Sequence, residues 1–256
     1  MKPNISEFSF GYAFVEHIAR TPGLPFAASP VFPSLIREGE LGYDVELISE
    51  GVPLFLQFKL SDCLVKRNAK EEPNLGVPYF RMHIRSLRHS EQHRLLLDLE
   101  NDGELVYYVA PMFHQPNELN DAYLAHEVLL RSMIIEPSAI GHLTINEEHY
   151  LAFNNNRDVI VCSKPRKIEK RFAETNYFVS KVEEKVIKWQ KSSKSDDIDI
   201  LLGRLVEMIG QSKQRGFWDA IEPTKLLSDR PPLFQIAYLA RMFLDCEFLI
   251  VKGRII

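Results

Sequence analysis

The chain has 256 residues, 45% of them hydrophobic and 26% charged, with a formal net charge of −4. This composition is typical of a globular protein of one large or two modest domains. The acidic balance argues against a protein that coats nucleic acid non-specifically, because such proteins are usually basic.

The cysteines Cys63, Cys162 and Cys246 are odd in number and far apart. They indicate a reduced cytoplasmic setting and argue against a disulfide framework or a zinc finger. The N-terminus lacks a signal-peptide pattern, and no apolar run reaches the length of a membrane span. We therefore expect a cytoplasmic protein with no membrane partner.

The first predicted element is a helix over residues 6–20, with Ser6 as its N-cap and Thr21-Pro22-Gly23 as its end. Helical spacing predicts an apolar face made by four side chains: Phe8, Tyr12, Val15 and Ala19.

A β-hairpin over residues 41–60 follows a first strand at 34–40, with the turn at Glu50-Gly51. The period of two in a strand places Leu54, Leu56, Phe58 and Leu60 on one face and Phe55, Gln57 and Lys59 on the other.

If Asp44 on the first arm faces Gln57 and Lys59, the hairpin gathers a carboxylate, an amide oxygen and an ammonium group. Oxygen ligands suit a hard cation such as Mg²⁺, and the Phe58 carbonyl adds another. Lys59 can orient the attacking water or stabilise charge in the transition state. The alternative is a simple ion pair between Lys59 and an Asp44 at the hairpin edge.

The strand from Tyr79 alternates, so that Arg81, His83 and Arg85 share one face. Such a cationic face can contact a phosphate backbone, or it can be the exposed face of an antiparallel sheet. His89 and His93 flank the start of a helix over 90–101; no third zinc ligand is evident, so we interpret them as structural or phosphate-contacting.

Residues 105–110 predict a strand buried on both faces. The later elements expected are a helix at 117–131 with Leu124, Val128 and Leu129 in its apolar face, strands at 149–153 and 159–162, Lys-rich helix at 164–194, helices at 197–211 and 233–246, and a strand at 248–251. The change in composition predicts two parts: an α/β domain at 1–163 and a mostly helical accessory region at 164–256.

An Asp on one strand followed by Gln-x-Lys on the next resembles the PD-(D/E)xK restriction-endonuclease-like superfamily, and its Mrr-type and anti-phage DNase branches in particular. The resemblance covers roughly residues 6–112. Tyr43 stands where the family has Pro, and Gln57 replaces the second carboxylate.

The resemblance implies an α/β fold with a mixed central sheet and an αβββαβ core. It implies a Mg²⁺- or Mn²⁺-dependent DNA endonuclease of antiviral defence, acting on DNA as a homo-oligomer or in a larger defence complex. The catalytic residues would be Asp44, Gln57 and Lys59, with Glu16 from the first helix and Glu7 as second choice; Glu38 and Glu40 are reserve ligands. Asp44, Gln57 and Phe58 would hold the metal, and Arg81, His83 and Arg85 would contact DNA.

Two other classes of function are weighed against this one. A catalytically inactive module with the same fold, binding nucleic acid or a protein partner, is favoured by Gln57 and by the acidic net charge. An enzyme of another kind that uses the histidines is the third hypothesis, and the sequence contains no Ser-His-Asp spacing, Gly-rich phosphate loop or HExxH motif for it.

Overall fold

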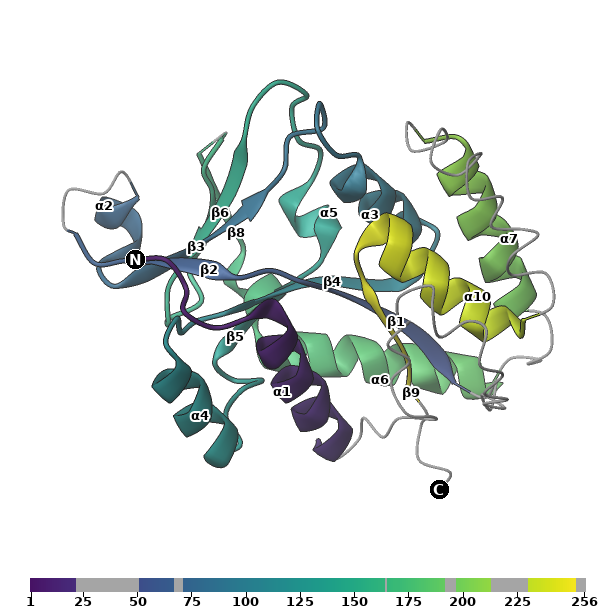
Figure 1. Ribbon diagram of the computed structural model, residues 1–256, viewed down its shortest axis with the longest axis horizontal. Helices are drawn as coiled ribbons and strands as arrows, with labels where there is room; N and C mark the ends of the chain where they lie inside the picture. The colour runs from purple at the N-terminus through teal and green to yellow at the C-terminus, as the bar shows by residue number, and fades with distance from the viewer. Residues whose placement is uncertain (22–50, 67–70, 164, 192–196, 213–229, 252–256) are drawn as a thin grey trace.

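The computed structural model describes residues 1–21, 51–66, 71–163, 165–191, 197–212 and 230–251. These residues form two sheets with helices around them (Figure 1). One sheet is mixed and the other is antiparallel, so the predicted α/β class with a mixed sheet is confirmed.

The mixed sheet, sheet A, has the strand order β5-β4-β1-β9. Strand β1 (Val52–Phe58) lies parallel to β4 (Leu105–Pro111), with Gln57 opposite Tyr108. Strand β9 (Glu247–Val251) lies antiparallel on the other side of β1, and β5 (Ser132–Ile135) lies antiparallel to β4. Every residue of β4 is buried, as its continuous apolar run predicts.

The antiparallel sheet, sheet B, has the order β2-β3-β6-β7-β8. Its strands are β2 (Ser61–Leu64), β3 (Tyr79–Ile84), β6 (His149–Phe153), β7 (Val159–Val161) and β8 (Arg166–Ile168). Strand β2 follows β1 after two residues, so Lys59 and Leu60 lie where the chain passes from sheet A to sheet B.

Helices cover both faces of sheet A. Leu54, Leu56 and Phe58 share an apolar cluster with α1 (Glu7–Arg20) and α6 (Thr175–Lys191). Phe55 belongs to the other cluster, which includes α3 (Gln92–Asn101), α7 (Asp197–Gly210), α10 (Pro232–Leu239) and the inner face of sheet B. The alternation predicted for the second hairpin arm is confirmed within β1. Shorter helices are α2 (Glu72–Leu75), α4 (Pro116–Leu124), α5 (Pro137–Ile140) and η2 (Lys170–Ala173).

Helix α1 begins and ends as predicted, but of the predicted apolar face only Val15 is buried, whereas Phe8, Tyr12 and Ala19 are exposed. The Ser6 hydroxyl accepts a hydrogen bond from the Ser9 backbone N–H at 2.9 Å. Phe8 and Tyr12 are 72% and 54% exposed. A second apolar stripe, with Phe10 and Phe14, faces the sheet instead. Both stripes have helical spacing, so spacing does not choose between them; the edge-on packing of the Phe10 and Phe14 rings against Phe58 does.

Two later helices differ from prediction. Helix α4 ends at Leu124, which is exposed, and His126 follows in the left-handed region (φ 55°), so Val128 and Leu129 are buried outside the helix. Within the Lys-rich stretch, the described chain first forms β8 and η2, and α6 begins only at Thr175.

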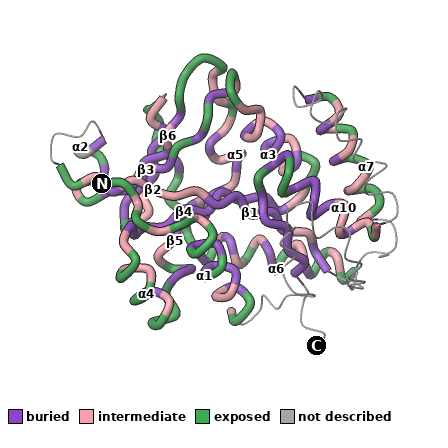
Figure 2. The backbone as a smooth tube through the Cα atoms, in the orientation of Figure 1, coloured by how far each residue is buried: buried purple, intermediate pink, exposed green. Residues whose placement is uncertain are grey.

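The buried residues concentrate along β1, β4 and β9 (Figure 2). Strands β8 and β9 lie after residue 163 in the chain, but each pairs with a strand before residue 163: β8 with β7, and β9 with β1. The boundary at 163 stays a prediction. Among the helices that the structure describes, none combines the length and the apolar character needed to cross a membrane.

Candidate functional site

A polar cluster lies where β1 ends and β9 begins. Gln57 is the last residue but one of β1, and the register pairs its neighbour Leu56 with Glu247 on β9. The π-helical turn η3 (Ala240–Leu244) precedes β9, and Asp245 follows it in the left-handed region (φ 53°). Few residue types other than glycine adopt this conformation, and aspartate is among those that tolerate it. The turn brings the Asp245 carboxylate beside β1.

Gln57 is fully buried, and its side-chain amide is paired on one side only. Nε2 donates to the Phe58 carbonyl at 3.1 Å and to Asp245 Oδ2 at 3.3 Å. Both partners can only accept, so the nitrogen rather than the oxygen must face them. Oε1 then points the other way, where it is buried and has no hydrogen-bond partner among the described residues. An unpaired buried oxygen is costly, and in native structures it often marks a place for a ligand, ion or water.

Three donors converge on Asp245 Oδ2. Besides Gln57, Lys59 Nζ lies 3.5 Å away and Gln92 Nε2, at the start of α3, also lies 3.5 Å away. Gln92 is held in place because it also donates to the Leu244 carbonyl at 2.7 Å. The Lys59 side chain is 20% exposed and that of Asp245 is 50% exposed, so solvent reaches the cluster.

Further charges surround these residues. Burial raises the pKa of Glu7, at the N-terminal end of α1, and the nearby Lys59 ammonium partly offsets the rise. Burial likewise raises the pKa of Glu247, against the effect of Arg241, whose guanidinium lies 2.7 Å from the Glu247 carboxylate. Arg241 also lies 3.9 Å from Asp245 Oδ1. The cluster thus mixes carboxylates and cations at short range.

The predicted partner of Gln57 and Lys59 cannot be placed. Asp44 lies outside the described residues, as do Glu38 and Glu40. The carboxylate that meets Gln57 and Lys59 in the described structure is Asp245.

The carboxylate of α1 that lies near the cluster is Glu7 at the N-terminal end, not Glu16, the first choice from the sequence. Glu16 forms an ion pair with Arg20, one turn further along α1. Glu7, the second choice, is the residue whose pKa responds to Lys59 and Asp245. Eight residues of helix lie between the two glutamates, so their backbone positions are about 13 Å apart along the axis.

The alternation predicted around β3 is confirmed: Phe80, Met82 and Ile84 are buried, and the predicted cationic residues lie on the other face. Two of these already have partners. The Arg81 guanidinium lies 4.7 Å from the centre of the Tyr150 ring, and His83 Nε2 bonds with Glu148. Arg85 is exposed just beyond the strand. Their contact with DNA stays a prediction.

His93 has a structural role, whereas His89 is exposed. The buried His93 ring bonds with the Tyr108 hydroxyl at 3.0 Å and with the Gly141 carbonyl at 2.8 Å. Burial lowers its pKa to about 4. It is therefore neutral at neutral pH and joins α3 to β4 and to the end of α5.

Sequence reasoning missed Gln92, Asp245 and Glu247. The signal for the last two was the Asp-Cys-Glu run directly before the predicted strand at 248–251, because a strand beside β1 brings its first residues to the end of β1. Within the described ranges, no group of three or more His, Cys, Asp or Glu side chains is arranged to hold a metal ion. The Asp245 carboxylate and the Phe58 carbonyl could contribute to one, and the Gln57 oxygen joins them only if its amide turns over and exchanges oxygen and nitrogen.

No protein-family model, curated protein or solved structure matches the chain.

Proposed function

We propose that the chain is a metal-dependent endonuclease that hydrolyses phosphodiester bonds in DNA at the cluster of Gln57, Lys59 and Asp245. One observation carries the proposal. The buried Gln57 amide reaches a carboxylate and a backbone carbonyl at once, while its own oxygen has no partner in the described structure. The position between these two oxygens, now filled by the amide N–H groups, suits a hard cation.

The arrangement of elements supports the same reading. Helix α1 packs on sheet A, β1 and β4 are parallel, and α3 lies in the connection between them. This order agrees with part of the αβββαβ core of the restriction-endonuclease-like superfamily. It departs from that core in the strand antiparallel to β1, which here is β9 from the end of the chain.

Each residue would then have a defined role. Asp245, the Phe58 carbonyl and, after its amide turns over, the Gln57 oxygen would hold Mg²⁺ or Mn²⁺, with waters completing the shell. Such an ion, when bound, polarises a phosphate and promotes ionisation of the attacking water. The Lys59 ammonium would stabilise the negative charge that develops on the phosphate oxygens.

DNA as the substrate, a homo-oligomer or a larger complex as the assembly, and antiviral defence as the setting rest on the resemblance. The exposed Arg85, with Arg81 and His83 beside it, is the surface proposed for the phosphate backbone.

A catalytically inactive binding module is the second candidate, and a specific observation favours it. Lys59 and Arg241 already balance the Asp245 carboxylate, and the described residues lack a cluster of three acidic or metal-binding side chains. In that case the cluster would be a polar network that fixes β9 to β1.

The experiment that separates the two is cleavage of supercoiled plasmid by the full chain with Mg²⁺, Mn²⁺ or a chelator. The variants tested are Lys59→Ala, Asp245→Asn and Asp44→Ala. The controls are Lys2→Ala and Asp62→Asn, because Lys2 and Asp62 form an ion pair with each other at 3.0 Å and neither belongs to the cluster. We expect Lys59→Ala to lose a factor of roughly 10²–10³ in rate, by analogy with the removal of an oxyanion donor.

Titration calorimetry with Mn²⁺ on the same variants gives a second readout. We expect wild type to bind and Asp245→Asn to bind weakly or not at all. Absence of both metal binding and cleavage in folded wild type rejects the nuclease in favour of the binding module. Equal cutting by wild type and Lys59→Ala would reject the role of Lys59.

A further inference from the structure

A serine and a histidine bond to each other on sheet B, apart from the cluster on sheet A. His149 begins β6, and Ser163 follows the end of β7, its antiparallel neighbour. His149 Nδ1 lies 2.8 Å from Ser163 Oγ, and His149 Nε2 lies 2.8 Å from the Thr144 carbonyl oxygen. The His149 residue is 1% exposed, so both ring nitrogens are held in this geometry.

The partners determine where the protons lie. A carbonyl oxygen can only accept, so Nε2 carries the hydrogen that it donates to Thr144. In the neutral ring Nδ1 is then an acceptor, and the Ser163 hydroxyl must donate to it. The Ser163 proton points at a base, and the oxygen lone pairs point away from it.

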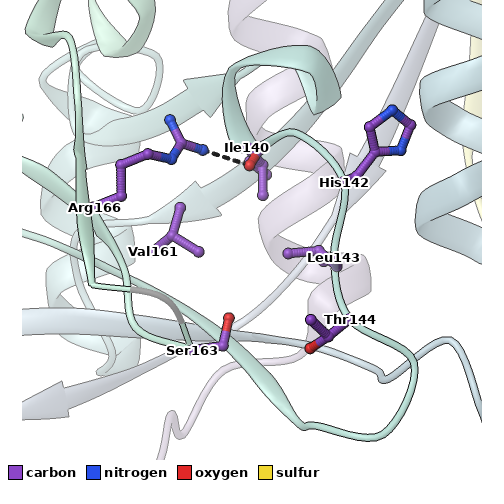
Figure 3. Close-up of a pocket in the computed structure, with 7 residues that line it drawn as sticks. All are labelled: Ile140, His142, Leu143, Thr144, Val161, Ser163 and Arg166. Carbon is purple, nitrogen blue, oxygen red and sulfur yellow. Dashed lines mark hydrogen bonds between the residues drawn. The ribbon is translucent and has the colours of Figure 1, made fainter.

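Ser163 also lines a small pocket of about 50 Å³. Figure 3 shows its hydroxyl directed into the space between Val161, Ile140 and Leu143. Because a water needs roughly 10–15 Å³ of such space, the pocket accommodates a group of a few non-hydrogen atoms. Arg166 lies at the rim, where its guanidinium donates to the Ile140 carbonyl at 2.6 Å and places a positive charge beside the pocket.

We propose that Ser163 is a nucleophile activated by His149, and that it accepts short acyl groups from small activated esters. A hydroxyl nucleophile requires a base within hydrogen-bonding distance and a third group that holds the base in the right orientation. Here the Thr144 carbonyl is the orienting group.

The step balances as an acyl transfer. Ser163 Oγ forms a bond to the ester carbonyl carbon while its proton passes to His149 Nδ1. The carbon–oxygen bond to the leaving alcohol breaks, and that alcohol takes the proton from His149. Water then attacks the acyl-serine by the same route and releases a carboxylic acid. The Arg166 guanidinium would stabilise the negative charge on the carbonyl oxygen.

The neighbouring thiol is a poor competitor. Burial, with the nearby Glu71 carboxylate, raises the pKa of Cys162 to about 12, so almost no thiolate is present at neutral pH. Acylation in this part of sheet B should therefore fall on the hydroxyl of Ser163.

The test is labelling of the full chain with p-nitrophenyl acetate and with a small fluorophosphonate, followed by intact mass and peptide mapping. We expect one label per chain, on Ser163, and its loss in Ser163→Ala. His149→Gln keeps an amide that can donate to the Thr144 carbonyl but removes the base, so Ser163 labelling should slow roughly 10²-fold or more.

Ser180→Ala is the matched control, because the exposed Ser180 hydroxyl donates to a backbone carbonyl, that of Tyr177, and has no imidazole partner. It should label like wild type. Labelling only on lysines, the N-terminus or Cys162, or unchanged Ser163 labelling in folded His149→Gln, overturns the proposal. If His149→Gln does not fold, wild type decides: Ser163 must react at least roughly 10²-fold faster than Ser180.

Discussion

The Gln57 amide on β1 donates to the Asp245 carboxylate, 188 positions later in the chain, at a distance of 3.3 Å. The bond joins β1, an inner strand of sheet A, to the turn before the edge strand β9, at the end where Lys59 and Glu7 also lie. It couples a buried residue with a half-exposed one, so its loss should lower stability and, on the proposed function, change cation binding, and the two effects can be measured separately.

Gln57→Glu tests both consequences. The substitution replaces a donor by a second carboxylate beside Asp245, so the metal-free protein should lose about 1–3 kcal/mol in its free energy of unfolding. Excess Mn²⁺ should then raise the melting temperature of Gln57→Glu more than that of wild type, since the ion would bind the native state between two carboxylates. Urea unfolding and thermal melts with and without Mn²⁺ measure this.

Gln235→Glu is the control, because Gln235 on α10 is partly buried and donates to the Arg230 backbone carbonyl, just before the helix. We expect no extra stabilisation of it by Mn²⁺. If Gln57→Glu also gains nothing from Mn²⁺, the space beside the amide is not a cation site.

The interaction of Lys59 with Asp245 should contribute little to stability. The distance is 3.5 Å and the Asp245 side chain is 50% exposed, so solvent screens the pair. A double-mutant cycle with Lys59→Met and Asp245→Asn should give a coupling of about 0–1 kcal/mol. The pair Lys2 and Asp62 provides the comparison cycle. A coupling above about 2 kcal/mol would instead mark the cluster as a structural network, and would favour the binding module.

Local patterns in the sequence were sufficient for several elements of the fold. The period of two along β1, the unbroken apolar run of β4 and the Ser6 cap of α1 each depend on neighbours in the chain. They predict the elements because strand parity and helix capping are local effects.

The position of β9 could not be predicted in the same way. Its strand character was predicted at 248–251, but its place beside β1 is a contact across about 190 residues, with no local signature. For that reason the sequence alone does not indicate Asp245 as a partner of Gln57. The buried face of α1 was mispredicted for a different reason. The helix has two apolar stripes, and only packing against Phe58 and Phe113 selects the one with Phe10.

The contact of β9 with β1 has a consequence for the predicted boundary at residue 163. A fragment of residues 1–163 lacks β9 and also α6, whose Phe178 and Val182 pack in the same apolar cluster as Leu54. We expect this fragment to lack a cooperative thermal transition and to bind a hydrophobic dye, because the edge of β1 and one face of sheet A lose their cover.

Circular dichroism melts and size-exclusion chromatography of the fragment measure this. A chain of residues 1–251, which keeps every strand that the structure describes, is the control and should melt cooperatively. A sharp melt of the 1–163 fragment would establish it as an independent domain.

His93 should make stability depend on pH. Burial lowers its pKa from the ordinary 6.5 to about 4 in the folded protein. Between these two values the unfolded chain binds a proton that the folded chain does not, so stability is full above pH 6.5 and is lost as the pH falls towards about 4. The lowered pKa corresponds to about 3 kcal/mol of stability at neutral pH. His93→Gln retains groups able to accept from the Tyr108 hydroxyl and donate to the Gly141 carbonyl, but it does not titrate. Urea unfolding at several pH values should therefore show a shallower loss of stability for His93→Gln than for wild type across this window.

His89→Gln, at an exposed position, should follow wild type. Parallel curves for wild type and His93→Gln would mean that the His93 ring takes up its proton without leaving its two hydrogen bonds, and that its burial does not govern the acid sensitivity of the fold.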